Sequence, residues 1–296
     1  MNEKLGLVTV LYNSNPVLEG FLKSISLQDY KNYHLYLIDN SSSQETDLLL
    51  AELLIKYLVT DYTHIKNDKN NGVALGNNQG IKQSLQDGCD YVILLNNDIE
   101  FDQTYLFSEM IDLAENKGED LIVPKIYFYG TNKIWMAGGK ILKYKGYTIN
   151  YGEGEEDGPQ YNNDLYCNFA PTCFMLINKK VFADVGLMDE KYFVYFDDTD
   201  FLYKAAKKGY RILYHANLKV FHKISSSTGG TGDKESPFSL YYSHRNRLYF
   251  IRKNFTGASR LVSLSYTLIT RLFKYISYNK ENKTIFLKSV KDGFKM

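Results

Sequence analysis

The sequence predicts an open α/β sheet flanked by helices, followed by a C-terminal helical extension. In the first hundred residues, apolar runs of strand length alternate with segments whose apolar residues recur at helical spacing. Residues 91–95 are entirely apolar, as expected for a strand in the middle of a parallel sheet. Residues 261–276 repeat apolar side chains at helical spacing, so we expect the tail to be helical.

The first strand–helix units have clear boundaries. Residues 5–12 form an apolar run, and Pro16 begins a helix because proline is tolerated in the first turn. A second strand over 34–38 ends at the polar run 39–43, and residues 44–58 return to helical spacing. A short strand near Ile65, a helix over 74–85 and the strand 91–95 continue the alternation, which places ligand sites at the carboxyl ends of the strands.

The pattern then becomes irregular. Residues 125–170 are rich in Gly, Tyr and Asn, and we interpret them as a β-rich insertion lining a pocket, with strands near Trp135 and Tyr147. The remaining expected elements are a strand at 173–177, helices at 179–185 and 199–208, and strands near 212 and 220. Ser225–Asp233 is interpreted as a flexible loop. We therefore divide the chain into a domain of residues 1–225 and a loop with a basic helical region, 226–296.

Composition narrows the function classes. The chain has 35 Lys+Arg and 34 Asp+Glu, so its net charge of +1 gives no case for nucleic-acid binding by the chain as a whole. Apolar residues make up 44%, which excludes disordered and collagen-like classes. Three cysteines without a CxxC pair indicate neither a zinc site nor a disulfide framework. The N-terminus lacks a signal-peptide pattern and no apolar stretch is long enough to span a membrane, so we expect a cytoplasmic protein.

Common nucleotide and hydrolase motifs are missing. There is no GxxxxGK[ST], the first strand does not lead into GxGxxG, and no GxSxG is present. These absences count against a P-loop NTPase, a dinucleotide-binding Rossmann domain and an α/β-hydrolase.

Acidic residues instead stand at strand and helix ends. Asp39 follows the second strand, where a turn or cap role is an equal alternative. Asp98 follows the central apolar strand. Burying a carboxylate there costs free energy unless a cation binds it or a hydrogen-bond donor pairs with it. Hard oxygen ligands of this kind suit Mg²⁺ or Mn²⁺ bridging a diphosphate.

A second acidic group precedes a predicted helix. Asp197, Asp198 and Asp200 can simply cap that helix and complement its dipole. Crowded carboxylates also repel one another, which can raise a pKa and supply a general base. His222, at the end of the strand near 220, can be an ordinary sheet-edge histidine or part of the same site.

Five segments and their spacing carry a family resemblance. They are VTVLYN at 8–13, LIDNSS at 37–42, NNGVALGNNQG at 70–80, LLNNDI at 94–99 and GLMDEKYFVYFDDTDF at 186–201, followed by KKGYRILYHANLKVFH at 207–222. In this order the chain resembles family 2 glycosyltransferases of the GT-A fold, in particular the bacterial branch that includes rhamnosyltransferases of polysaccharide assembly. The likeness covers residues 5–225 and implies a Rossmann-like mixed sheet flanked by helices.

The resemblance implies roles for individual residues. Those expected to bind the nucleotide sugar are Val10, Tyr12, Asn13, Asp39, Asn71, Gly72, Asn77, Asn78 and Asn97, with Asp39 on the base. Asp98 is the metal-binding carboxylate of a DxD-type motif in which Asn96 replaces the first acid, and His222 supplies a second contact to Mg²⁺ or Mn²⁺. Asp198 is the catalytic base. Asp197 remains a rival because the pair is Asp-Asp where the family usually has Glu-Asp.

A sugar and acceptor pocket is expected from the insertion. Trp135, Gly138 and Gly139, together with Asp200, would shape it, since aromatic faces can stack on apolar faces of sugars. The alternative is that Trp135 belongs to the core.

These residues predict an inverting, metal-dependent glycosyltransferase of cell-surface polysaccharide biosynthesis. The donor expected first is dTDP-rhamnose and then a UDP-hexose, and the acceptor is a hydroxyl of a glycan or polyprenyl-linked sugar. One alternative is a non-catalytic scaffold that binds nucleotide sugars. A nucleotidyltransferase is disfavoured because no Gly-rich, Arg- or Lys-bearing loop follows Leu11.

The tail suggests a second function. Residues 245–296 contain 12 Lys+Arg and 2 Asp+Glu. Residues 258–278 form a basic amphipathic segment that can lie on an anionic bilayer at the inner face of the cell membrane. Its apolar stripe is Leu261, Leu264, Leu268, Leu272 and Ile276, near Arg260, Arg271 and Lys274. The alternative is that the stripe packs on the catalytic domain or on a second subunit of a homodimer.

Overall fold

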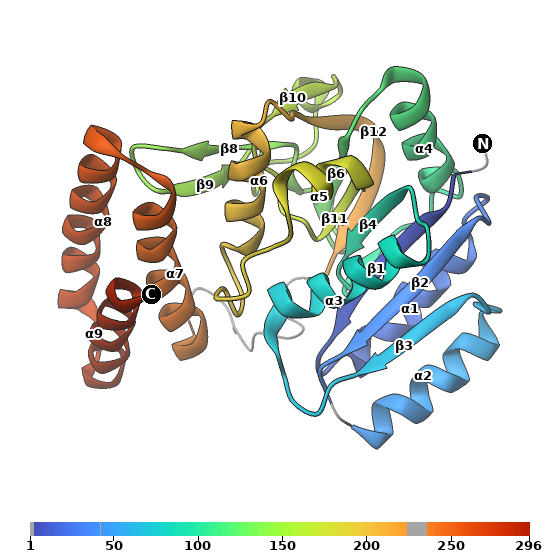
Figure 1. The fold of residues 1–296 in the computed structure, drawn as a ribbon, viewed down its shortest axis with the longest axis horizontal. Coiled ribbons are helices and arrows are strands. Elements are labelled where there is room, and N and C mark those ends of the chain that lie inside the picture. Colours follow the sequence, from blue (N-terminus) through green and yellow to red (C-terminus); the bar gives the residue numbers. More distant parts are fainter. Residues whose placement is uncertain (1–2, 42, 224–235) are drawn as a thin grey trace.

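The computed structural model describes residues 3–41, 43–223 and 236–296 of the chain. It contains one large mixed sheet between layers of helices, with a group of three helices at the C-terminal end (Figure 1). In chain order the elements are β1 (Leu5–Leu11), α1 (Asn15–Ser26), β2 (Tyr33–Asp39), α2 (Gln44–Lys56), β3 (Tyr62–Lys66), α3 (Gly72–Gln86), β4 (Tyr91–Leu95), β5 (Ile99–Glu100), α4 (Leu106–Lys117), β6 (Leu121–Phe128), β7 (Ile134–Met136), β8 (Gly139–Leu142), β9 (Tyr147–Asn150), η1 (Pro159–Tyr161), β10 (Leu165–Cys167), β11 (Phe174–Asn178), α5 (Lys179–Val185), α6 (Asp197–Lys207), β12 (Ile212–His222), α7 (Pro237–Asn254), α8 (Gly257–Ser277) and α9 (Lys280–Lys295).

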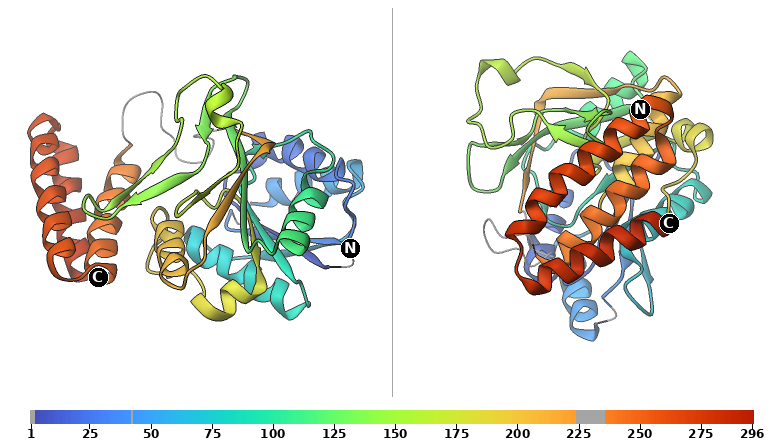
Figure 2. Two further views of the ribbon diagram at one scale, coloured as in Figure 1. Left: turned by 90° about the horizontal axis from the view of Figure 1, so that it is seen from above. Right: turned by 90° about the vertical axis from the view of Figure 1, so that its left-hand side faces the viewer.

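The predicted alternation of strands and helices is confirmed in the first hundred residues. The sheet order is β10-β12-β6-β11-β4-β1-β2-β3, and β1 to β4 run parallel to their neighbours in this half. Right-handed crossovers place α1 and α2 on one face of the sheet and α3 on the other (Figures 1 and 2). The carboxyl ends of β1, β2 and β4 therefore meet at one edge, where the polar residues predicted for the site begin.

The prediction for β4 needs one correction. This strand is buried along its whole length, but it pairs parallel with β1 and antiparallel with β11. The sheet is thus mixed at this point, whereas the apolar run alone suggested the middle of a parallel sheet. A strand buried on both faces has the same composition whichever way its neighbours run, so strand direction could not be determined from the sequence.

Other differences lie in the second half of the chain. The strands expected near 212 and 220 form a single strand, β12, whose register with β6 shifts between His215 and Lys219. Helix α4 and strand β6 were not anticipated. The predicted flexible loop Ser225–Asp233 and the domain boundary at 225 lie outside the described residues.

Glycines bring α3 close to the sheet. A Cβ added to Gly80 would lie 2.4 Å from Cγ1 of Val8, and one added to Gly76 would lie 2.8 Å from Cγ2 of Val10. Larger residues would push the helix away from β1. The helix N-terminus is thereby held near the end of β1.

The C-terminal helices α7, α8 and α9 lie side by side, as the right-hand view of Figure 2 shows. Helix α7 is joined to the catalytic half of the chain through residues 189–200, as described below. Within the described ranges, none of the helices combines the length and the apolar character that crossing a bilayer requires.

Candidate active site

The end of β4, the start of β11 and the start of α6 meet at Cys173. The N–H of Asn96 donates to the carbonyl of Cys173 at 2.8 Å, because β4 and β11 pair antiparallel. Burial raises the pKa of the Cys173 thiol, and the charges of Asp98 and Asp198 raise it further. Two carboxylates far apart in the sequence therefore act on one buried group.

Asp98 lies against His222. The Asp98 Oδ1 and His222 Nε2 atoms are 3.2 Å apart, and both side chains are nearly buried. Pairing of β5 with β12, which sets His222 opposite Ile99, brings them together. The ring of Trp135 stands edge-on to the His222 ring, with centroids 4.5 Å apart. The insertion thus reaches the predicted metal pair.

The donor set at this pair fits Mg²⁺ or Mn²⁺. It offers a carboxylate oxygen, which suits both ions, beside an imidazole nitrogen. Nδ1 of His222 is buried and has no hydrogen-bond partner among the residues that the structure describes. Asp98 and His222 are the residues that the sequence predicts would hold the cation.

Asp197 and Asp198 form a tightly interacting pair. Burial raises the pKa of Asp197 to about 8, with the charge of Asp198 adding to the effect. Burial also raises the pKa of Asp198, although N–H donors from Thr199 and Thr172 oppose this. Asp197 is only 4% exposed, whereas Asp198 keeps partial contact with solvent. Asp198 is accordingly the member of the pair that an acceptor could reach.

The loop before this pair is strained and held from α7. Tyr195 and Phe196 have φ values of 64° and 69°, which side chains other than glycine rarely adopt. The fully buried Asn246 donates from Nδ2 to the carbonyls of Val194, at 2.7 Å, and Tyr195, at 2.9 Å. Sequence analysis missed Asn246, because a single asparagine in a basic helix carries no pattern. It positions the loop that leads into Asp198.

Asp200, which was predicted to border the sugar and acceptor pocket, is bonded to residues at the C-terminal end of α7. It is fully buried, and its oxygens accept from Lys253 Nζ at 2.8 Å and Asn254 Nδ2 at 2.7 Å. Lys253 also bonds Asp189 at 2.7 Å. These contacts tie α6 and the 189–196 loop to α7.

We predict that Asp200→Asn lowers the free energy of unfolding by about 2 kcal/mol, since charge-assisted hydrogen bonds to Lys253 and Asn254 are weakened. Denaturant unfolding measures this loss. Tyr166→Phe, which removes an exposed hydroxyl bonded to Glu119, is the control and should be close to neutral. Unchanged stability combined with a raised KM for the acceptor would instead favour the pocket role.

Several residues predicted for the nucleotide lie around the ends of β1 and β4 and the start of α3. Asn97 Nδ2 donates to the carbonyl of Val10 at 2.6 Å, which joins the two strand ends. Tyr12 and Asn13 follow β1 and are exposed. Asn71 is the N-cap residue of α3, and Gly72 is its first residue.

Helix α3 also contacts the loop before Asp197. A Cβ on Gly72, whose φ is +80°, would lie 2.3 Å from the Phe193 carbonyl oxygen, so this approach requires glycine. Asn78 donates to the carbonyl of Met188 at 2.9 Å and accepts from its N–H at 3.0 Å. Its neighbour Asn77 is buried against the Met188 sulfur. The contacts of Asn78 are those of a residue that positions this loop.

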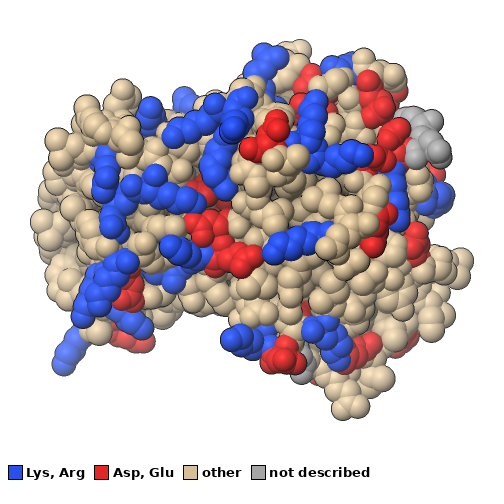
Figure 3. All heavy atoms as spheres, viewed as in Figure 1, with Lys and Arg blue, Asp and Glu red and all other residues tan. Residues whose placement is uncertain are grey.

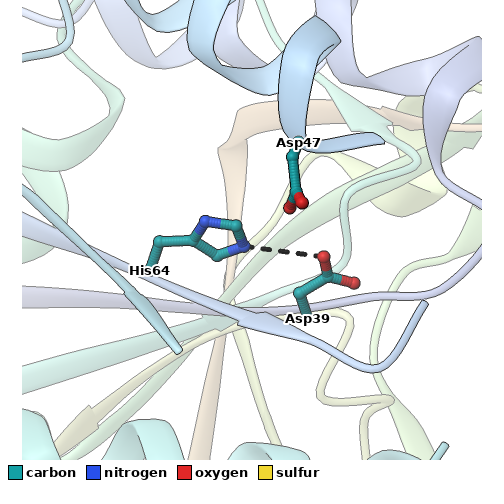
Figure 4. Close-up of side chains that lie close together, drawn as sticks. All are labelled: Asp39, Asp47 and His64. Carbon is teal, nitrogen blue, oxygen red and sulfur yellow. Dashed lines mark ion pairs between the residues drawn. The ribbon is translucent and has the colours of Figure 1, made fainter. Parts of the chain in front are cut away.

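Asp39 belongs to a second polar group, which Figure 4 shows with His64 and Asp47. The ligand atoms of the three side chains lie within 4.8 Å of one another. Although burial acts to raise it, the pKa of Asp39 lies below its ordinary value because His64 lies 3.5 Å from the carboxylate and the N–H of Ser41 donates to it. Asp47 is paired with Lys66. This group is distinct from the Asp98–His222 pair, and His64 was not anticipated.

The two glycines predicted for the sugar and acceptor pocket, Gly138 and Gly139, have backbone roles. Gly138 has φ of +83°, and a Cβ on Gly139 would lie 2.5 Å from the Ile149 carbonyl oxygen across the β8–β9 hairpin. Both permit the turn into the hairpin. Trp135, which is half-buried, is the residue of this set that contacts the Asp98–His222 pair.

Comparison with known proteins identifies the family. Residues 7–186 match the model of glycosyl transferase family 2. The chain belongs to this family. Two curated relatives align over most of their length. The dTDP-rhamnosyl transferase RfbF of Shigella flexneri is 24% identical, covering 86% of this chain and 82% of the relative. The low-salt glycan biosynthesis hexosyltransferase Agl10 of Haloferax volcanii is 23% identical, covering 92% and 82%.

A solved structure confirms the fold. The mannosyltransferase PcManGT from Pyrobaculum calidifontis, in complex with GDP-Man and Mn²⁺, superposes with a TM-score of 0.60. The match covers 100% of this chain and 87% of that chain at 10% identity. The family 2 chain therefore has the predicted GT-A fold, and it is a glycosyltransferase by family.

Proposed function

We propose that this family 2 chain is an inverting glycosyltransferase that uses a nucleotide-sugar donor and a divalent cation. The observation that carries the proposal is that the charges of Asp98 and Asp198 both act on the buried Cys173, while Asp98 is paired to His222. In this proposal Asp98 would serve the diphosphate end of a donor, and Asp198 would serve the acceptor.

The donor half would be formed by the strand ends and α3. In this proposal Asp39 contacts the base, Val10, Tyr12 and Asn13 form the floor, and Asn71, Gly72, Asn77, Asn78 and Asn97 border nucleotide and sugar. Mg²⁺ or Mn²⁺ bound by Asp98 and His222 would neutralise charge on the departing diphosphate. The Mn²⁺ and GDP-Man named for the mannosyltransferase are consistent with such a site.

Asp198 would act as the base. An acceptor hydroxyl is too weak an acid to ionise unaided, so a carboxylate must take its proton as the hydroxyl oxygen attacks the anomeric carbon. The bond from that carbon to the diphosphate breaks on the opposite face, which inverts its configuration. Burial favours this role, because a raised pKa strengthens the carboxylate as a base. Trp135 and the insertion would border the acceptor and the sugar.

The donor proposed first is dTDP-rhamnose, since RfbF is named as a dTDP-rhamnosyl transferase. A hexose donor is second, in line with the name of Agl10. The acceptor would be a hydroxyl of a glycan or of a polyprenyl-linked sugar, and the enzyme would act in the cytoplasm at the inner face of the membrane.

Thermal unfolding with dTDP, UDP and GDP, each with and without Mn²⁺, tests donor binding. A ligand at about 100 times its Kd should stabilise the fold by about 2.7 kcal/mol, which is a shift of about 4 °C for a chain of this size. We expect the largest shift with dTDP and Mn²⁺ together. Lack of a shift with every nucleotide would contradict the proposal, whereas binding without transfer of any sugar would favour a non-catalytic scaffold.

A further inference from the structure

Helix α8 is amphipathic with its apolar side facing outward. Its buried residues are Ser263 and Thr267, and the hydroxyl of Ser263 donates to the carbonyl of Lys143 in the β8–β9 hairpin. The polar side of α8 thus packs on the protein. The large apolar side chains on its other side are exposed by 40 to 70%, namely Leu261, Val262, Leu268, Ile269, Leu272, Phe273 and Ile276.

This arrangement bears on whether the predicted apolar stripe of the tail packs on the rest of the chain. Four residues of the predicted stripe, Leu261, Leu268, Leu272 and Ile276, are exposed, and only Leu264 packs against buried side chains of α7. The stripe therefore does not pack on the catalytic domain. An apolar surface of this extent is typical of a binding face.

A groove continues the apolar surface between α8 and α9. Its volume is about 320 Å³, and it is lined by Leu268, Ile269, Leu272, Phe286 and Val290. All five lining residues are apolar, so their side chains cannot form hydrogen bonds with a polar ligand. The groove is suited to bind a hydrocarbon chain.

Helices α8 and α9, which carry this face, are basic. Of the 12 Lys and Arg in residues 245–296, exposed ones on α8 and α9 include Arg260, Lys274, Lys280, Lys288 and Lys291, against two acidic residues in the same segment. Figure 3 shows blue side chains gathered over α7 and α9 beside a tan outer edge where α8 lies. An apolar face with a basic border complements an anionic lipid surface.

We propose that the outer face of α8 and the α8–α9 groove dock onto an anionic bilayer, with acyl chains against the apolar side chains and lipid phosphates at the basic border. A second copy of the chain fits less well. A two-fold contact through α8 would bring one basic border against the other, and like charges repel.

Docking at this face would connect the candidate active site to the lipid surface through α7. Helix α8 packs on α7, and Asn246 of α7 holds the carbonyls of Val194 and Tyr195 in the loop before Asp197. Membrane docking would bring the enzyme to a lipid-linked acceptor, and this part of the inference rests on the proposed function. Vesicle binding itself is measured without any transfer reaction, so the two proposals can fail separately.

Sedimentation with vesicles tests the surface. The full chain should pellet with vesicles of equal phosphatidylglycerol and phosphatidylcholine, less with phosphatidylcholine alone, and less at high salt. Leu272→Gln/Phe273→Gln should lower the partition coefficient at least about tenfold, because two exposed apolar side chains no longer enter the bilayer. Lys280→Gln/Lys291→Gln should lower it about tenfold on anionic vesicles only, because both lysines are exposed on α9.

The matched control is Ile55→Gln on α2, since Ile55 is 77% exposed and lies outside the tail. It should bind vesicles as the wild type does, and every variant should keep its thermal shift with nucleotide. Two results would overturn the proposal: a wild type that stays in the supernatant with anionic vesicles, or a dimer by light scattering that Leu272→Gln/Phe273→Gln converts to monomer.

Discussion

Asp198→Asn is expected to lower kcat by about 10²- to 10⁴-fold, the usual contribution of a general base. The amide has nearly the same shape and can still accept from the N–H of Thr199, which bonds the Asp198 carboxylate at 2.6 Å. The loop and the donor site should therefore stay in place. Initial rates with a nucleotide sugar and acceptor, beside the Kd of the nucleoside diphosphate, separate the lost chemistry from binding.

Asp197→Asn is the control for this substitution. Asp197 is buried, and burial raises its pKa to about 8, so it ionises less readily than an ordinary aspartate and is less accessible to an acceptor than Asp198. Its amide variant should keep most of the wild-type kcat. If instead Asp197→Asn were inactive and Asp198→Asn active, the roles of the two residues would be exchanged.

The same pair predicts the direction of pH effects. A base must be ionised, so kcat should fall as pH is lowered through the raised pKa of Asp198. Stability should change in the opposite sense. Folded Asp197 keeps a proton that the unfolded chain releases above its ordinary pKa of 3.8, so stability falls as pH rises from there to about 8. Asp197→Asn should remove much of this dependence in denaturant unfolding at several pH values.

Asp98→Asn is expected to abolish the effect of Mn²⁺ on donor binding and to slow transfer about 100-fold or more, since a cation at a leaving diphosphate supplies several kcal/mol. His222→Gln should act in the same direction, because its Nε2 lies 3.2 Å from the Asp98 carboxylate. Isothermal titration of the nucleoside diphosphate with and without Mn²⁺ measures the first effect, and initial rates measure the second.

Asp47→Asn is the matched control, because Asp47 belongs to the other group that could hold a cation, with Asp39 and His64. It should leave the response to Mn²⁺ unchanged. If Asp47→Asn lost the response to Mn²⁺ and Asp98→Asn kept it, the cation would bind at the Asp39–Asp47–His64 group, and the proposed role of Asp98 would be wrong.

Much of the fold could be predicted because its signals are local. The strands β1, β2 and β4 and the helices α1 to α3 follow from apolar spacing and from boundary residues such as Pro16. The order of motifs then indicated the family, which the match over residues 7–186 confirms. Strand direction around β4 and the single strand β12 did not follow, since pairing between distant segments decides both.

Some residues of the candidate site could be predicted from the sequence, and others could not. Residue types and motif spacing singled out Asp98, Asp198 and His222. The structure pairs Asp98 with His222, and the charges of Asp98 and Asp198 both act on Cys173, while the roles of the three residues stay predictions. The residues that hold the site, Asn246 and Lys253, come from the tail and were not expected. Asp200 was predicted to border a pocket, and in the structure it contacts Lys253 and Asn254 of α7.

The chain's order of apolar and polar residues was enough to determine the alternation of elements, the family and the chemical groups available. Tertiary structure alone decided which of these groups share a location and which side of α8 faces outward. The physical reason is that helical spacing defines two faces of a helix without saying which one is covered. Burial depends on segments far away in the chain, and here a hairpin and α7 cover the polar face.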